Sequence, residues 1–586
     1  LVIGEGEFLI AGQELDGDDI LYKTNHEIVL NNSKISEISS LYVSRNKKLD
    51  FNSSFRLVSG IFSKQIANSI EEVNDFNYNN ELFSSLGEDQ TFISSQFKSM
   101  ESSKLGFAVS SPTLLSANSN REVMFDFYFT IDSIQYLSNL IIDISNNTQQ
   151  SEEKVFSDIF SNSFDINYTS NDSWVPISNY NFEYPEDWSK GIISIKIILD
   201  KSLPPISNYV NEVHDKNIES GFPVFEFLLS EKNFYYPYSF LNGIEINKID
   251  INLSVSNLKN LKILNELGSV SNDSDFEMFG PSPEKGSKLY IGNAEIFSKK
   301  IQKLTLGWDY TNLPYDHENF EGFYKDYNYS INNDSFKIKI EALSDYSYRR
   351  NVEDELIYNL FNSEENKLMK SRIIENIDCD VLKLKPSYNL TEENIDIYSN
   401  DLESGYIKLE LVNPVIGFGF NYYPKLLEKT IENASKIKSK KDSNEQYSYP
   451  NEPYCPKISD IYLNYSSKTS ILFNESNEDG NDSFFLVHPN EGYNRVSSNL
   501  RNNINLIPEL KSQGELTIGF NKIKPLQDLN LLFEIEKNEH TNYKFSSNLE
   551  WFYSSFNGWK KIEKSNILYD EPSNLMKTGV ICFKLN

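Results

Sequence analysis

The sequence predicts a mainly β, multidomain protein of β-sandwich-like domains with a few helices, α+β overall. Its 586 residues exceed what one hydrophobic core organises, because a domain usually takes about 150 residues. Aromatic residues make up 13% of the chain, with 35 Tyr and 39 Phe, and these residue types favour strands. Several segments also alternate apolar and polar residues with the period of two that a half-buried strand shows.

Four segments are expected along the chain. Residues 1–104 are expected to be an irregular N-terminal part of a larger core, and residues 105–275 a β-sandwich with an inserted helix. Residues 276–450 are expected to form a mixed α+β domain. A second β-sandwich is expected over 451–586 and to continue beyond the last residue. The clearest expected elements are strands at 121–130, 191–200, 223–229 and 246–256 and a helix at 152–164.

The charge and the rarer residue types exclude several classes of function. The chain carries 85 acidic and 55 basic residues, a net charge of −30, so a nucleic-acid partner would be repelled. Its three cysteines, Cys379, Cys455 and Cys582, form no C-x-x-C pair and are expected to be reduced and structural. The histidines never fall at the spacing of a helical zinc site. We therefore expect no metal, no cofactor and no direct membrane insertion.

Two further segments are expected to be helices, and each of them allows two interpretations of its function. Phe320, Phe323, Tyr324 and Tyr327 fall at helical spacing, which fits either a carbohydrate-binding platform or, as we favour, a helix face packed on the core. Residues 422–443 predict a helix that runs into a lysine cluster, as suits a helix C-terminus. That cluster either contacts an acidic neighbour or, as we favour, is a solvated loop. It consists of Lys436, Lys438, Lys440 and Lys441.

The loop FGPSPEKGSKLYIG, residues 279–292, imitates a phosphate-binding loop but has its glycine and lysine exchanged. A P-loop needs its lysine directly after the glycine, in the first turn of a helix. Here Lys285 comes too early and residues 289–291 predict a strand. Because Pro281 and Pro283 fix φ and Gly280 and Gly286 permit a sharp reversal, we expect a stiff corner between the first sandwich and the next sheet. We expect Trp308 to anchor the partner of the strand that follows.

No catalytic residue is predicted. The acidic run at 474–482 places Glu475, Asn477, Asp479 and Gly480 in the phase of a calcium loop, but Leu486 stands where a bidentate glutamate is needed;. There is no G-x-S-x-G elbow, and nothing selects two carboxylates for glycoside hydrolysis. The alternative function left open is a secreted β-sandwich protein that binds carbohydrate or hydrolyses glycosides.

A succession of short motifs runs the whole length of the sequence. It begins at 6–35 and continues at 105–129, 257–268, 276–314, 405–427, 514–535 and 551–585. The motif residues in the second and fourth stretches are Gly106, Ser111, Pro112, Leu114, Arg121, Phe279, Gly280, Pro281, Pro283, Gly286, Ser287, Tyr290, Ile291, Gly292, Glu295, Phe297, Lys299, Leu304, Trp308, Leu313 and Pro314. In this order they resemble the J-like baseplate wedge proteins of contractile injection systems, especially the large wedge component of antifeeding-prophage-type particles. The chain departs from that pattern at Phe420, where the family usually has histidine.

The resemblance implies a structural protein and no enzyme. It implies a six-fold baseplate in which this chain links neighbouring wedges to each other and to the central hub and sheath, and rearranges on contraction. The implied partners are further copies of the chain, a J-like wedge partner, the spike or hub, the sheath initiator and, as a further candidate, tail fibres. Assembly would take place in a bacterial cytoplasm, and the particle would be released or anchored at the envelope. The structural motif most specific to the resemblance consists of Phe279, Gly280, Pro281, Pro283, Gly286, Tyr290, Gly292, Trp308 and Pro314.

Overall fold

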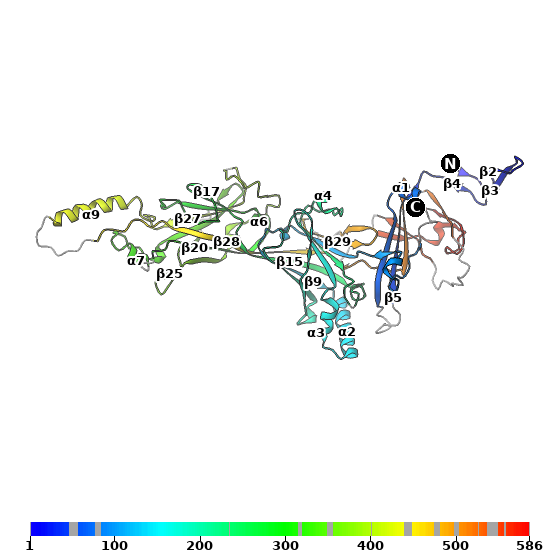
Figure 1. Cartoon of the computed structure of the whole chain (residues 1–586), viewed down its shortest axis with the longest axis horizontal. Coiled ribbons are helices and arrows are strands. Elements are labelled where there is room, and N and C mark those ends of the chain that lie inside the picture. Colours follow the sequence, from blue (N-terminus) through cyan, green and yellow to red (C-terminus); the bar gives the residue numbers. More distant parts are fainter. Residues whose placement is uncertain are drawn as a thin grey trace. The chain divides into compact units, whose positions relative to one another are not determined.

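The computed structural model describes residues 2–45, 57–76, 84–233, 235–314, 319–348, 355–399, 401–438, 448–473, 481–496, 503–524, 527–535, 549–555 and 558–584. The chain forms two compact units, and the description below takes each by itself. The smaller unit comprises residues 1–43, 61–102 and 512–586, and the larger comprises residues 44–60 and 103–511. Strands dominate both units (Figure 1), which confirms the predicted mainly β class.

A nine-stranded antiparallel sheet runs through the larger unit. Its strand order is β12, β13, β9, β15, β28, β20, β26, with β18 pairing β28 and β31 pairing β15. The strands are β9 (Asn120–Phe129), β12 (Tyr180–Glu183), β13 (Ile192–Leu199), β15 (Glu245–Leu258), β18 (Phe276–Glu277), β20 (Ile301–Tyr310), β26 (Ser371–Ile377), β28 (Lys457–Leu472) and β31 (Ile504–Asn505). The central β15 and β28 are 14 and 16 residues long. β28 pairs with β15 along residues 463–472 on one edge and with β20 along residues 458–467 on the other.

A six-stranded sheet packs on the half of this sheet that contains β9. It consists, in spatial order, of β11 (Trp174–Ile177), β10 (Phe164–Thr169), β14 (Val224–Leu229), β8 (Gly106–Ser110), β29 (Ser483–His488) and β30 (Gly492–Arg495). The ring of Phe107 lies 5.5 Å from that of Phe127 on the facing sheet, and Phe125 lies 5.2 Å from Phe227. Edge-to-face contacts of this kind add to the burial energy of a sandwich core. The four predicted strands of this region are confirmed as β9, β13, β14 and β15.

A seven-stranded sheet lies beside the other half of the nine-stranded sheet, the half that contains β20. Its strands are β17 (Gly268–Val270), β16 (Lys262–Asn265), β19 (Lys288–Gly292), β27 (Tyr406–Asn413), β21 (Lys337–Ser344) and β22 (Ser347–Tyr348), with β23 (Leu356–Asn359) also pairing β21. A cluster of buried aromatic rings connects it to β20. Tyr310 stacks on Phe361 at 4.8 Å, and Phe320 lies 4.9 Å from Phe336.

The helices of the larger unit are few and mostly short. They are α2 (Ile131–Thr148), α3 (Glu152–Phe160), α4 (Asn211–His214), α5 (Tyr238–Leu241), α6 (Ala294–Phe297), α7 (Phe320–Phe323), α8 (Cys379–Leu382) and α9 (Tyr423–Lys438), with a short hairpin of β24 (Ser363–Glu364) and β25 (Lys367–Leu368). The long α2 follows β9 directly and lies beside α3 (Figure 1). Side chains of Thr130 and Ser151 cap the two helices, as residues of this type commonly do.

The predicted helices have mixed outcomes. The helix predicted at 152–164 is α3, which ends at Phe160 because β10 begins at Phe164. α2 was not predicted, although Ile134, Leu137 and Ile141 form its buried stripe. Its Ile, Ser and Asn content lowers helix propensity and hides that stripe. The helix predicted at 422–443 is α9, and the rest of that prediction, with Lys440 and Lys441, lies outside the described residues.

The smaller unit contains several small antiparallel sheets. Most of a four-stranded sheet belongs to it, in the order β32 (Gly514–Asn521), β5 (Lys34–Arg45), β6 (Val58–Ala67) and β7 (Glu101–Ser102). A three-stranded sheet has the order β33 (Asp528–Phe533), β37 (Gly579–Lys584), β36 (Ile567–Asp570). The remaining elements are the pairs β1 (Val2–Ile3) with β4 (Ile28–Val29), β2 (Phe8–Gln13) with β3 (Asp19–Lys23) and β34 (Phe552–Ser555) with β35 (Gly558–Lys561), and helix α1 (Ile70–Asp75).

Two expectations about the segments need correction. Residues 1–104 are not irregular, since β5 and β6 are 12 and 10 residues long; serines such as Ser39 and Ser40 occupy buried positions and mask the alternation. Residues 451–586 do not form one sandwich. β28 and β29 belong to sheets of the larger unit, whereas β32 pairs with β5, so that Leu516 lies opposite Ser40. Strand partners this distant in sequence leave no trace in local periodicity.

Candidate functional site: the Pro-Gly loop and a buried polar junction

The loop singled out in the sequence connects two sheets of the larger unit. β18, just before it, pairs with β28 in the nine-stranded sheet, and β19, just after it, lies in the seven-stranded sheet. Phe279 at its start is completely buried and Pro283 is buried, whereas Pro281 is exposed. The strand predicted at 289–291 is confirmed as part of β19. The backbone after Lys285 therefore enters a sheet and does not form the helix N-terminus that a phosphate site requires.

Two glycines give this loop its backbone shape. Gly280 has φ +88° and Gly286 has φ +97°, values that residues with a Cβ rarely adopt. The N–H of Gly280 donates to the carbonyl of Glu277 at 3.2 Å, and the N–H of Gly286 donates to the carbonyl of Leu411 at 2.7 Å. The loop thus reverses at Gly280 and attaches to the end of β27 at Gly286.

A second segment, residues 411–421, closes over the loop. The N–H of Leu411 donates to the carbonyl of Ser287 at 2.9 Å, and Asn421 donates to the carboxylate of Glu284. Gly417 has φ +55°, and a Cβ built on it would lie 2.7 Å from the Cα of Glu284. Backbone packs on backbone at this point, so only glycine fits at 417.

The other residues of the motif separate into different environments. A Cβ on Gly292 would lie 2.5 Å from the ring of Tyr406, so this glycine admits that ring. Tyr290 lies 4.7 Å from the ring of Tyr398 in a cluster of tyrosines. Trp308 is only 1% exposed, but it lies in β20, which pairs with β26 and β28. The expectation that Trp308 anchors the partner of the strand at 290 is therefore wrong, because β19 pairs with β16 and β27. Pro314 is half-buried after β20.

A buried polar junction brings together residues from separate motif stretches. We use this name for Arg121, Glu295, Lys299 and Tyr465. The ammonium of Lys299 donates to the carbonyl of Leu115 and to the Tyr465 hydroxyl at 3.1 Å. The Tyr465 hydroxyl in turn donates to Glu295 Oε1, and the N–H of Ala117 donates to Glu295 Oε2 at 2.8 Å.

Arg121 completes this junction through the backbone. Its Nε donates to the carbonyl of Ser119 at 3.1 Å, and its terminal nitrogens donate to the carbonyls of Pro204 (2.8 Å), Leu203 (3.0 Å) and Asp200 (3.1 Å). The residue is 1% exposed, and the four hydrogen bonds to backbone carbonyls offset the cost of burying its charge. The guanidinium therefore fixes the turn at 200–204 against the start of β9.

Burial governs the electrostatics of the polar junction. It lowers the pKa of the Lys299 ammonium to about 8, and the carboxylate of Glu295 opposes that shift. Burial and then Glu295 raise the pKa of Tyr465 well above its usual value. The Lys299 ammonium and the Glu295 carboxylate are thus connected through the neutral phenol of Tyr465. This arrangement suits a structural crosslink between α6, β28 and residues 115–117.

A second buried carboxylate lies on the outer face of the six-stranded sheet. Both oxygens of Glu226 lie 2.7 Å from the ammonium of Lys216, and Tyr493 and Asn167 also donate to this carboxylate. The same ammonium lies 4.1 Å from the ring centroid of Trp174, a cation–π distance. The lysine, tyrosine and amide donors thus satisfy Glu226, a fully buried charge, as such groups require.

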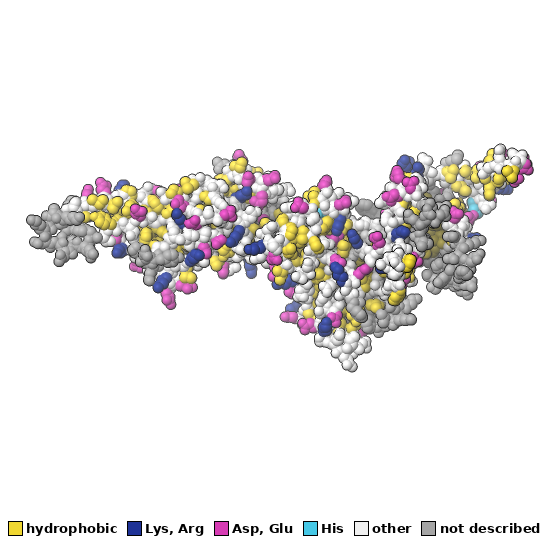
Figure 2. All heavy atoms as spheres, viewed as in Figure 1, with side chains coloured by type: hydrophobic (Ala, Val, Ile, Leu, Met, Phe, Trp, Pro, Cys, Tyr) yellow, Lys and Arg dark blue, Asp and Glu magenta, His cyan; other side chains and the backbone are white. Residues whose placement is uncertain are grey.

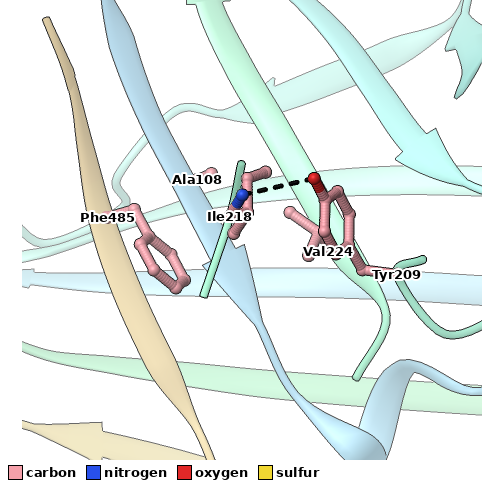
Figure 3. Packing of buried hydrophobic residues seen from close by; sticks show 5 residues of the cluster. All are labelled: Ala108, Tyr209, Ile218, Val224 and Phe485. Atoms are coloured by element: carbon pink, nitrogen blue, oxygen red, sulfur yellow. Dashed lines mark hydrogen bonds between the residues drawn. The ribbon is translucent and has the colours of Figure 1, made fainter. Parts of the chain in front are cut away.

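A small apolar cluster covers the same face beside Glu226. It contains Ala108, Val224 and Phe485 from the sheet and Tyr209 and Ile218 from the segment that crosses it (Figure 3). The hydroxyl of Tyr209 accepts a hydrogen bond from the N–H of Ile218 at 3.2 Å. The crossing segment therefore seals this part of the face against solvent.

Of the aromatic stripe, only Phe320 and Phe323 lie in helix α7 (Phe320–Phe323), and Tyr324 and Tyr327 follow in the turn after it. Phe320, Tyr324 and Tyr327 are 0%, 1% and 5% exposed, which confirms packing and leaves no platform for a sugar ring. Within the described ranges, no cluster of His, Cys, Asp and Glu is placed to hold a metal ion, and no helix is long and apolar enough to cross a membrane. The weighed calcium ligands, Glu475, Asn477, Asp479 and Gly480, lie outside the described residues.

Comparison with protein-family models and with curated proteins found no match to this chain.

Proposed function

We propose that this chain is a structural wedge component of the baseplate of a phage-tail-like contractile injection system. In this role it links neighbouring wedges to one another and to the central hub and sheath, and it rearranges when the sheath contracts. Its contacts are heterologous ones that close into a six-fold ring. A change of ring diameter needs interfaces with two packed arrangements.

The observation that supports this proposal is where the shared motif residues lie. Arg121 comes from the stretch at 105–129, and Glu295 and Lys299 come from the stretch at 276–314. In the polar junction all three bond to the backbone of one short segment, residues 115–119. Charged residues with this degree of burial serve to fix strands and helices to each other. Motif residues that build a scaffold fit a structural family better than a catalytic one.

The test is co-expression with the products of neighbouring genes, followed by mass measurement and negative-stain imaging. The expected result is incorporation of the chain into ring-shaped or wedge-shaped assemblies. A stable monomer that binds or hydrolyses glycans and never enters a contractile particle would overturn the proposal in favour of the carbohydrate-active alternative. A glycan-binding assay on the free chain separates the two directly.

A further inference from the structure

The hairpin of β2 and β3, residues 8–23, leaves its apolar side chains exposed; we call it the N-terminal arm. Phe8 and Ile10 are 66% and 67% exposed, and Tyr22 is 65% exposed. Figure 2 shows hydrophobic side chains on the surface of the arm. Every residue of both strands is exposed, whereas an isolated two-stranded hairpin has little stability in water. An apolar surface of this kind marks an interaction site.

Both faces of the arm are apolar. The register places Ile10 opposite Leu21 on one face and Leu9 opposite Tyr22 on the other. An ordinary hairpin that packs on a core would be apolar on one face and polar on the other. β2 and β3 pair only with each other among the described strands, so their outer edges also remain open. This pattern fits insertion between two surfaces or into a sheet better than adsorption on one surface.

The root of the arm is held in a fixed geometry. The hydroxyl of Thr24 donates to the carbonyl of Gly4 at 2.7 Å and accepts from the N–H of Glu7 at 3.0 Å. The ring of His26 stacks on Tyr569 at 4.6 Å. The Thr24 bonds thus close the base of the hairpin, and the His26 ring joins this segment to the three-stranded sheet of the smaller unit. Because the arm is already formed and anchored, its docking costs less conformational entropy than docking of a disordered tail.

The acidic turn of the arm indicates which charge its partner carries. Glu14, Asp16, Asp18 and Asp19 are all exposed, and none of them forms an ion pair with a described residue. A second copy of the chain would meet this turn with a net charge of −30. Charge complementarity therefore favours a different protein with basic residues at the end of its apolar site.

We propose that the N-terminal arm inserts into an apolar slot of a different protein subunit, with its acidic turn against lysine or arginine side chains of that subunit. This inference rests on the proposed function, which supplies such subunits. The apolar faces provide most of the binding energy, and the turn provides orientation and salt dependence.

Photo-crosslinking in the full chain, co-expressed with the neighbouring gene products, tests the inference. A photoreactive amino acid replaces Leu9 in one variant and Ile10 in another, so that it reports from each face. The expected result is that both variants crosslink to the same protein, which mass spectrometry identifies as a different chain. Crosslinks only to a second copy of the chain, or from only one face, would overturn the insertion.

A matched pair of variants measures the energetic contribution. Phe8→Ser combined with Ile10→Ser should reduce co-purified partner at least about tenfold, as loss of buried apolar anchors does. The control changes Ile397 and Val415, exposed by 79% and 75% in the larger unit, to Ser and should leave the yield unchanged. Circular dichroism of each free chain checks that folding is intact.

The charge and the proposed function are tested separately. Asp16→Lys with Asp18→Lys should weaken capture and reverse its salt dependence; capture that stays unchanged would overturn the assignment of a basic partner. If the wild-type chain enters particles and the arm variants enter them with the same efficiency, the arm inference fails and the proposed function stands. If no contractile particle contains the chain while both faces crosslink to one protein, the proposed function fails and the arm inference stands.

Discussion

The ammonium of Lys299 lies 3.1 Å from the hydroxyl oxygen of Tyr465 in the core of the larger unit. The same hydroxyl donates a hydrogen bond to one carboxylate oxygen of Glu295, and the other oxygen accepts a hydrogen bond from the N–H of Ala117. A cation and an anion are therefore buried together through one phenol. Such a network holds its elements in one arrangement only while every member is present.

Lys299→Met should lower the free energy of unfolding of the larger unit by about 3 kcal/mol, because it removes the donor to the Leu115 carbonyl and the Tyr465 hydroxyl and leaves the buried Glu295 network incomplete. Lys299→Met combined with Glu295→Gln should recover part of that loss, since both charges are then absent. Lys300→Met is the matched control, because Lys300 is exposed. Urea titration monitored by hydrogen exchange in β28 measures the three variants. Equal stability of Lys299→Met and Lys300→Met would contradict the network.

The same lysine gives stability a dependence on alkaline pH. Its pKa in the folded chain is about 8, below the ordinary 10.5, so the unfolded chain binds more protons between these values. The contribution of Lys299 to the free energy of unfolding therefore rises as pH increases through that window. The stability difference between wild type and Lys299→Met should grow between about pH 7 and about pH 10. If urea titrations gave the same stability difference between the two proteins at every pH, the pKa of Lys299 would not be lowered in the folded chain.

Glycine substitutions in the loop and its covering segment should give a graded loss of stability. Gly417→Ala should cost about 3 kcal/mol, because the new Cβ meets the backbone of Glu284 and φ is positive. Gly286→Ala meets open space and should cost about 1 kcal/mol through its φ alone. Gly221→Ala, also in open space and without positive φ, should stay within about 0.5 kcal/mol of wild type. Thermal melting measures the three variants. A stability loss for Gly417→Ala that is no larger than that for Gly286→Ala or Gly221→Ala would contradict this account.

The sequence predicted the strands of the first sandwich well because their alternation is strong. In β9, Val123, Phe125 and Phe127 are buried in the core, whereas the residues that alternate with them, such as Met124 and Asp126, are only half-buried. The prediction of strands from the sequence failed where polar residues occupy the core, as Ser39 and Ser40 do in β5. It also failed where pairing joins segments far apart, as β32 joins β5. Local periodicity identifies strands but does not choose their partners.

The candidate site was only partly predictable. Glycine and proline content identified the loop at 279–292, because positive φ and fixed φ have direct signatures in sequence. The segment that covers it, including Gly417, belongs to a separate stretch of the chain. Arg121, Glu295 and Lys299 appear in the resemblance as unconnected matches, and Tyr465 is not part of it. Their common role depends on β28, which supplies Tyr465 from far along the chain.

Asp250 on β15 should make the larger unit sensitive to acid. Burial alone would raise its pKa, but hydrogen bonds from Lys248 and Lys468, with those from Ser470 and Tyr128, hold the pKa below its usual value. A depressed pKa contributes stability above the unfolded value of about 4, and that stability is lost as pH falls through the folded pKa.

Asp250→Asn should therefore destabilise the chain by about 2 kcal/mol at neutral pH, and its unfolding curve should approach that of wild type as pH falls. Asp132→Asn is a suitable control, because Asp132 is an exposed carboxylate in the first turn of α2. Chemical denaturation across the acidic range measures both variants. A stability gap that widens in acid would contradict the assigned sign.

Arg121→Lys should behave as a disruptive change despite keeping the charge. The guanidinium reaches four backbone carbonyls at 2.8 to 3.1 Å, whereas an ammonium has three donors in a different geometry. At least one carbonyl of the turn at 200–204 would lose its donor, for a cost of about 2 kcal/mol. Lys201→Arg, at an exposed position in the same turn, should have almost no effect. Hydrogen exchange at 200–204 and thermal melting distinguish the two, and equal protection of this turn in both variants would show that the fork geometry of Arg121 is not required.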